Sequence, residues 1–301
     1  PGVMSSNPDN PFLPANQSAY ARWRERKLIL MENNPGKMTQ IKNPGALLPS
    51  EYQQISTQMQ AHNLALFKVD ADPKITSQVL KSLGHQFGLN HLDGNLCAND
   101  SDISELRVID KGRRGEYIPY TSRPLGWHTD GYYNHPDKTI RSFVLYCIND
   151  AEEGGENQLL DPELAYIRLR DTNNSYIDAL MHPETLTIPQ TVEEGGYVRP
   201  AQTSPVFQVD PLNGNLLMRF TQRKTHIQWR QDATTKEALS LLGDLLASDS
   251  AHILKHRLGP GEGLVCNNVL HNRSGFTDSA EHARVMLRAR YYDRFKEYTH
   301  A

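Results

Sequence analysis

The sequence is poor in cysteine, in long apolar runs and in net charge. Three of its 301 residues are cysteines, and Cys97, Cys147 and Cys266 lie far apart. An odd, scattered set makes neither a disulfide framework nor a zinc cluster, so we expect a cytoplasmic protein. No apolar run approaches the roughly 20 residues of a membrane-spanning helix, and we expect no membrane partner.

The opposite charges nearly balance. The chain has 32 Lys and Arg against 35 Asp and Glu, a formal net charge of -3. This balance argues against a protein that binds nucleic acid through bulk electrostatics. Hydrophobic residues make up 38% and charged residues 22%, which suits a globular protein with a sizeable core. We therefore expect a small-molecule partner rather than a nucleic acid.

A single domain is the expected organisation. The length allows one large β-rich domain or two average ones, and the sequence shows no internal repeat, low-complexity tract or linker. Residues 1–18 are rich in Asn, Pro and Ser and predict a flexible N-terminal tail. Residues 19–31 predict a helix with a basic face that lies on the domain, with a partner contact as the alternative. Residues 19–301 then form the domain.

The rest of the pattern predicts a mainly β fold with flanking helices. Helices are expected over 48–63, 75–87 and 233–247, and one more begins at Asp161-Pro162, with the aspartate as N-cap. Short strands separated by turn signals favour a β-sandwich or jelly roll decorated by helices. The expected strands are 64–69, 106–110, 139–148, 157–160, 185–188, 206–209, 216–220, 253–258, 264–267 and 284–292.

Candidate metal ligands occur in His-x-Asp pairs. Such a pair and one distant His suit a non-haem Fe(II) site, because two imidazoles and one carboxylate leave the opposite side of an octahedral ion open. The chain has three pairs, at residues 91–93, 128–130 and 135–137, and each alone is more typical of a surface or capping pair. The middle pair follows Gly126-Trp127 and precedes a long predicted strand, and His271 lies far downstream.

Four ordered motifs distinguish the middle pair. They are WHTD at 127–130, EEGGENQLLD at 152–161, CNNVLHNRSGF at 266–276 and ARVMLRARYY at 283–292. With the segment from Phe87 to His91, they resemble the taurine dioxygenase-like family of Fe(II)- and 2-oxoglutarate-dependent oxygenases. The resemblance covers the chain from about residue 64 onward. It implies a double-stranded β-helix, or jelly roll, with the metal at one open end.

The resemblance also implies the ligands and the reaction. His128, Asp130 and His271 would bind Fe(II), and 2-oxoglutarate and O2 would be consumed to give succinate, carbon dioxide and a hydroxylated substrate. The carboxylate of Asp130 favours hydroxylation or desaturation, since halogenating relatives lack it, and we expect hydroxylation. Trp127 is expected to pack beneath the metal loop, and Cys266 to be a small buried core residue.

Two residues would bind 2-oxoglutarate by the same resemblance. Arg284 would pair with the distal carboxylate, a task that suits a guanidinium because its fork binds carboxylates bidentately and keeps its charge. Family members often add a threonine after a Gly-Gly-Asp turn. This chain has Gly-Gly-Glu-Asn at 154–157, so Asn157 would have to serve through its amide.

Three residues are candidates for the substrate side. Arg288 lies on the same strand face as Arg284 by period-two alternation, and its match in taurine-type members implies a carboxylate or sulfonate on the substrate. Arg290 shares this face, and we expect it to be a solvated arginine on an exposed strand face. His91 matches a family histidine, and Asp93 stands where a second histidine would be. A carboxylate there would suit the ammonium group of an amino acid or betaine-like substrate.

Two other functions stay open. One is a jelly-roll isomerase or dioxygenase that does not use 2-oxoglutarate, which would apply if Arg284 does not face the metal. The other is a non-enzymatic binding protein. Loops 90–102, 111–124 and 190–203 are expected to be lids and specificity elements. Analogy with the family suggests a homodimer or tetramer.

Overall fold

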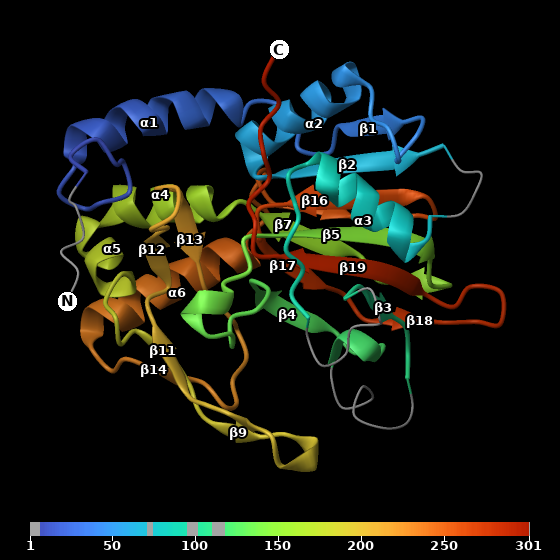
Figure 1. Cartoon of the computed structure of the whole chain (residues 1–301). Coiled ribbons are helices and arrows are strands. Elements are labelled where there is room, and N and C mark those ends of the chain that lie inside the picture. Colours follow the sequence, from blue (N-terminus) through green and yellow to red (C-terminus); the bar gives the residue numbers. More distant parts are fainter. Residues whose placement is uncertain (1–6, 71–74, 95–101, 110–117, 301) are drawn as a thin grey trace.

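The computed structural model describes residues 7–70, 75–94, 102–109 and 118–300, and most of its strands lie in two sheets (Figure 1). The larger sheet has six strands in the order β1-β2-β16-β5-β19-β3. Its pairs are antiparallel except β1 and β2, which run parallel. The strands are β1 (Met38–Ile41), β2 (Leu64–Val69), β16 (Glu262–Cys266), β5 (Ser142–Asn149), β19 (Val285–Tyr291) and β3 (Ser104–Leu106).

The smaller sheet has four strands in the order β15-β7-β17-β4 and carries the metal-site histidines. The strands are β15 (Leu254–His256), β7 (Asn157–Leu160), β17 (Leu270–Arg273) and β4 (Leu125–His128). Side chains from the two sheets share one buried cluster. Leu145, Cys147 and Met286 enter it from the larger sheet, and Leu159 from the smaller. Two antiparallel sheets with a common core confirm the predicted jelly roll, and Cys266 is buried in this core as expected.

Two helices cover the other face of the larger sheet. They are α2 (Pro49–His62) and α3 (Ser77–Gln86). Helix α2 starts where predicted, because Glu51 accepts from the backbone N–H of Leu48 at 2.9 Å. Helix α3 ends at Gln86, and Gly88 follows its C-cap with a φ of +78°, the conformation of a terminating glycine. No helix in the described part of the chain is long and apolar enough to cross a membrane.

A large insert separates β7 from β15, which are neighbours in the smaller sheet. It contains α4 (Pro162–Thr172), α5 (Asn174–Leu180) and α6 (Ala233–Ala247). Asp161 caps α4 as predicted, accepting from the N–H of Glu163 at 2.8 Å. Short hairpin strands make up the rest: β8 (Leu186–Ile188), β9 (Thr191–Val192), β10 (Val198–Arg199), β11 (Gln202–Ser204), β12 (Phe207–Val209), β13 (Leu216–Met218) and β14 (Gln228–Trp229).

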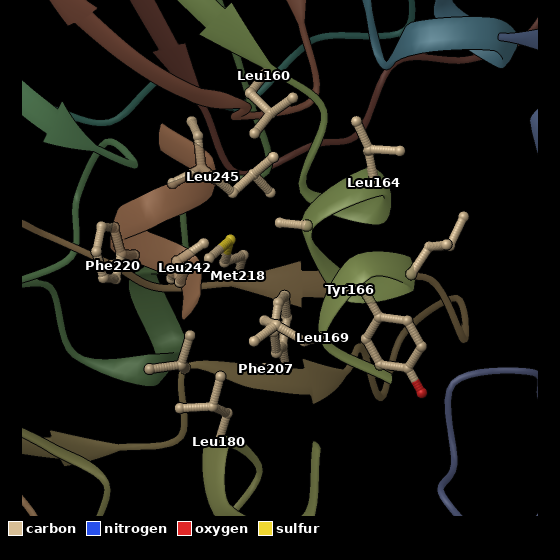
Figure 2. Packing of buried hydrophobic residues seen from close by; sticks show 14 of the residues in the cluster. Leu160, Leu164, Tyr166, Leu169, Leu180, Phe207, Met218, Phe220, Leu242 and Leu245 are labelled. Carbon is tan, nitrogen blue, oxygen red and sulfur yellow. The ribbon is translucent and has the colours of Figure 1, made fainter. Parts of the chain in front are cut away.

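The insert has a hydrophobic core of its own. Its helices and the β12–β13 hairpin contribute most of the buried side chains, and Leu160 connects this core with β7. Figure 2 shows the packing of Leu164, Tyr166 and Leu169 of α4 with Phe207, Met218, Leu242 and Leu245. Trp127 of β4 belongs to the same cluster. The strand that ends in His128 is therefore anchored by the insert on one face.

The segment before residue 18 is packed against the domain from Asn10 onward, although a flexible tail was expected there. Phe12 is buried, and its carbonyl accepts from the hydroxyl of Tyr166 at 2.6 Å. Helix α1 (Gln17–Leu30) follows. Its Lys27 is buried and forms ion pairs of 2.6 Å with Asp161 and with Glu163. The helix thus lies on the domain as expected, fixed to the start of α4.

Candidate active site

Two adjacent strands of the smaller sheet bring the expected ligands together. His128 ends β4, and His271 lies opposite it on β17. Their ring centroids are 4.2 Å apart. Asp130 follows His128 by two residues, just past the strand. Because neighbouring residues of a strand point to opposite faces, Trp127 enters the insert core while His128 points to the other side. His271 was expected just after a strand and lies within one.

The three side chains have the geometry of a metal site. One ligand atom from each of His128, Asp130 and His271 lies within 4.8 Å of the others. Asp130 Oδ1 is 3.3 Å from His128 Nε2 and 3.2 Å from His271 Nε2. Each ring directs Nδ1 at a backbone carbonyl, that of Gly126 at 2.8 Å and that of Val269 at 2.9 Å. Nδ1–H donation to these carbonyls leaves the lone pairs of both Nε2 atoms available.

The environment favours the protonation states that bind a metal. Burial and the nearby His271 lower the pKa of His128. Burial raises the pKa of Asp130, but its contacts with both histidines and the charge of Arg288 outweigh burial and hold that pKa well below its usual range. Asp130 Oδ2 is also buried without a hydrogen-bond partner. Two Nε2 atoms and a buried carboxylate that converge on one point suit a bound cation, so the donor set fits a divalent metal.

Asn268 holds the loop that carries Asp130. Its Oδ1 accepts from the N–H of Asp130 at 2.7 Å, and its Nδ2 donates to the carbonyls of Asp130 at 3.0 Å and Ile140 at 2.9 Å. Gly131 follows with a φ of +66°, and a Cβ there would meet Ile140 Cγ1 at 2.5 Å. The loop therefore requires an asparagine on one side and a glycine on the other.

Replacing Asn268 by alanine is expected to weaken Fe(II) binding by about 10- to 100-fold, the usual cost of losing a group that orients a ligand. The substitution leaves the N–H and carbonyl of Asp130 unpaired, so the carboxylate loses its fixed position. Fe(II) affinity would be measured by anaerobic titration. Asn267→Ala is the matched control, because Asn267 bonds to Asn63 and Phe295 instead. Equal losses in both variants would contradict the role of Asn268.

The other two His-x-Asp pairs do not join this cluster. His135 accepts at Nδ1 from the N–H of Asp137, and both side chains are largely exposed. His91 has a side chain 73% exposed and lies 2.9 Å from Asp293, so the structure gives it a surface ion pair rather than a place near the metal. Asp93 is buried and accepts from Arg290 at 2.7 Å and from the hydroxyl of Tyr292 at 2.6 Å. Its carboxylate is satisfied within the protein, which removes the reason to expect it to hold a substrate ammonium.

Arg284 is the buried cation expected at the co-substrate end. It lies just before β19, beside the small sheet of β6 (Glu153–Gly154) and β18 (Phe276–Thr277). Its guanidinium carbon is 5.2 Å from the ring centroid of Phe276. Among the described residues no carboxylate forms an ion pair with it, and burial lowers its pKa to about 10. A buried, charged and unpaired guanidinium is suited to an external carboxylate.

Asn157 and Arg273 lie near this end of the barrel. Asn157 Nδ2 donates to the carbonyl of Asn272 at 2.9 Å, so only its second N–H remains for a carboxylate. Arg273 was not predicted. It is buried, its guanidinium carbon is 4.9 Å from the Phe276 ring, and burial followed by the charge of Arg284 lowers its pKa to about 9. Its position two residues after His271, on the same strand face, was a usable signal.

The other two arginines of β19 have different environments. Arg288 Nη1 is 4.0 Å from Asp130 Oδ2, and its Nε is buried without a hydrogen-bond partner. Arg288 therefore points toward the expected metal ligands, and its Nε–H has no acceptor within the protein. Arg290 is fully engaged at both terminal nitrogens, since Nη1 donates to the Tyr133 hydroxyl at 3.1 Å and Nη2 to Asp93. The expectation of a solvated Arg290 on an exposed strand face is therefore wrong, because the side chain is buried and bonded within the protein.

Aromatic rings flank the histidines, and sequence reasoning missed them. The ring centroid of Phe143, on β5, is 4.9 Å from that of His271. Tyr132 lies 6.4 Å from His128 and 5.2 Å from Tyr133. These rings restrict water on two sides of the candidate metal position, which strengthens electrostatic contacts there.

Comparison with known proteins agrees with this geometry. Residues 34–290 match the family described as taurine catabolism dioxygenase TauD, TfdA family. A uridine-5'-phosphate dioxygenase of Amycolatopsis sp is 31% identical over 170 residues, which cover 55% of this chain and 60% of that protein. The matched part is thus less than two thirds of that relative.

Two solved structures share the fold. The non-heme iron oxygenase OrfP aligns with a TM-score of 0.59 and 14% identity, covering 96% of this chain and 92% of that one. An asparagine oxygenase, solved with Fe(II), 3-hydroxyasparagine and succinate, aligns with a TM-score of 0.57 and 15% identity, covering 91% of both chains. The family model matches most of this chain, and the three expected metal ligands lie together in the structure. The chain therefore belongs to the TauD/TfdA dioxygenase family.

Proposed function

We propose that this protein is an Fe(II)- and 2-oxoglutarate-dependent dioxygenase that hydroxylates an unactivated C–H bond of a small anionic metabolite. In the balanced reaction, substrate, 2-oxoglutarate and O2 give hydroxylated substrate, succinate and carbon dioxide. One oxygen atom enters the substrate and the other enters succinate. The iron, when bound, supplies the oxidising chemistry. The protein supplies the ligands, the placement of both organic molecules and a site sheltered from water.

The observation that carries this proposal is the unpaired Arg284. A metal triad alone would serve an isomerase or another dioxygenase equally well. A buried guanidinium with no carboxylate of its own has a large desolvation cost, which an incoming carboxylate offsets. Phe276 fixes the guanidinium from one side. Residues His128, Asp130 and His271 would hold the Fe(II), and Arg284, supported by Asn157, would hold the distal carboxylate of 2-oxoglutarate.

The substrate side favours an anion. Arg288 lies beside Asp130 with free donors, and we assign it to the anionic group of the substrate. Asp93 is engaged by Arg290 and Tyr292, so an amino acid or betaine-like substrate gains no ammonium site from it. A sulfonate fits Arg288. A nucleoside 5'-monophosphate fits it as well, and we place this class first because the Amycolatopsis relative is named for uridine 5'-phosphate.

Anaerobic titration with Fe(II) and 2-oxoglutarate tests the proposal. We expect the visible charge-transfer band of the chelated co-substrate to appear, followed on exposure to O2 by succinate formation that depends on the substrate added. Uridine 5'-phosphate, taurine and L-asparagine would be compared. Bound iron without any band would refute the use of 2-oxoglutarate and leave a metal enzyme of another class on the same jelly roll.

A further inference from the structure

We propose that Arg199 is a substrate-binding residue that recognises the ring of a nucleoside 5'-monophosphate, at the end of the substrate remote from Arg288. The inference rests on the proposed function and specifies its substrate site. Arg199 ends the hairpin of β9 and β10, residues 191–199, which we call the flap. Figure 1 shows the flap projecting from the insert, away from the packed body of the molecule.

Arg199 is held in place but not satisfied. Its guanidinium carbon lies 4.9 Å from the ring centroid of Tyr133, so the two groups stack. Its Nη1 lies 3.8 Å from a carboxylate oxygen of Glu193, a long ion pair beyond hydrogen-bond distance. Nε is buried without a hydrogen-bond partner, although the whole side chain is 24% exposed. A guanidinium that is oriented by stacking and still has donors available is suited to an external acceptor.

Two tyrosine rings lie between Arg199 and the candidate metal ligand His128. Tyr133 contacts Tyr132 edge to face, with centroids 5.2 Å apart, and Tyr132 lies 6.4 Å from His128. The hydroxyl of Tyr133 accepts from Arg290 Nη1 at 3.1 Å. Tyr133 is therefore hydrogen-bonded to Arg290 of the barrel, and its ring contacts the guanidinium of Arg199 of the flap. These contacts form a continuous path from the ligand His128 to the flap.

Phenol rings together with a guanidinium that forms only a long ion pair can recognise a nucleobase. Aromatic side chains stack on bases whatever their sequence, and arginine adds a cation over the π-system and donors to ring oxygens. A small sulfonate or amino acid has one anionic group, which Arg288 already serves, and no ring to place against Tyr132 and Tyr133. A nucleotide uses both ends of the site, with its phosphate at Arg288 and its base at Arg199.

The test compares three ligands, one that has both ends of the nucleotide and two that each lack one end. Uridine 5'-phosphate has both ends, ribose 5-phosphate lacks the base and uridine lacks the phosphate. Each would be titrated anaerobically into the protein loaded with Fe(II) and 2-oxoglutarate, and the perturbation of the charge-transfer band would report binding. We expect the affinity for uridine 5'-phosphate to exceed that for either fragment. Arg199→Ala should weaken uridine 5'-phosphate about tenfold, the low end of what one lost base contact costs, and leave ribose 5-phosphate unchanged.

Arg168→Ala is the matched control, since Arg168 is an exposed arginine on α4 of the same insert. It should bind all three ligands as wild type does. A wild-type protein that forms the band but ignores uridine 5'-phosphate would overturn the inference while leaving the proposed dioxygenase intact. Equal weakening of uridine 5'-phosphate and ribose 5-phosphate in Arg199→Ala would also overturn it, because Arg199 would then act on the phosphate or on the fold. Absence of the band itself would instead refute the proposed function.

Discussion

Replacing His271 by alanine is expected to abolish both the charge-transfer band and succinate formation. The variant keeps His128 and Asp130, but a two-ligand site holds Fe(II) far more weakly than three. We expect the affinity to fall by well over about a hundredfold, since even groups that only orient a ligand account for 10- to 100-fold. Fe(II) binding and 2-oxoglutarate chelation would be followed together under anaerobic conditions.

A control in the same sheet separates loss of the metal from loss of the fold. His256 lies on β15, two strands from β17, and pairs with Glu262 at 3.1 Å. His256→Ala also truncates an imidazole in the smaller sheet, and it should retain the band and the activity. Circular dichroism should show both variants folded. Wild-type iron affinity in His271→Ala would rule out the triad as the metal site.

Replacing Arg284 by alanine is expected to raise the 2-oxoglutarate concentration that half-saturates the band by about a hundredfold. A bidentate guanidinium–carboxylate contact contains two charge-assisted hydrogen bonds, each worth roughly 1.5–3 kcal/mol, and partial replacement by water reduces the loss. Fe(II) affinity should not change, because Arg284 is not among the triad. This separation of metal affinity from co-substrate affinity is the diagnostic result.

The conservative substitution Arg284→Lys makes this test more specific. Arg284→Lys keeps the charge and loses the fork, so its half-saturating concentration should lie between those of wild type and Arg284→Ala. Folding stability should change little in Arg284→Ala, because the substitution removes a buried cation that forms no ion pair among the described residues, and the nearby Asp278 accepts from the backbone N–H of Arg284, which remains. A large drop in melting temperature, with 2-oxoglutarate binding intact, would make Arg284 a structural residue.

The regular elements of the barrel could be predicted from local pattern. Strands β2 and β7 and helix α6 begin and end at the predicted residues, because apolar periodicity and turn residues agree along those segments. The starts of α2 and α4 were predicted from their capping residues. The insert strands β9, β10 and β14 were not, since each has only two residues. Strands β9 and β10 pair with each other, whereas β14 pairs with β8, which lies far earlier in the chain. Of the predicted strand 106–110, residue 110 lies outside the described residues, and the described part has β3 at 104–106 instead, paired with β19.

The residues of the candidate site also fall into those that the sequence could predict and those that it could not. The triad could be assigned from ordered motifs, the co-substrate role of Arg284 stays a prediction, and Arg273 was missed although strand alternation offered a signal for it. The contacts of His91 and Asp93 could not, because their partners Asp293 and Arg290 lie about two hundred residues downstream. Nor could Asn268, whose importance comes from a loop that begins at Asp130. Hydrogen bonds between polar groups far apart in the chain produce no periodic pattern in the sequence.

The strand order also determines at which stage of synthesis His128, Asp130 and His271 can come together. In the larger sheet, β16 lies between β2 and β5, and β19 lies between β5 and β3. A nascent chain that has emerged only as far as the insert would expose the edges of β2 and β5, together with His128 and Asp130 but without His271. Contacts between such distant segments form slowly, and open strand edges invite pairing with other chains. Under the proposed function, the three ligands can hold Fe(II) together only after β17 has paired with β4, and the core of the insert is also completed late, because Leu270 of β17 belongs to it.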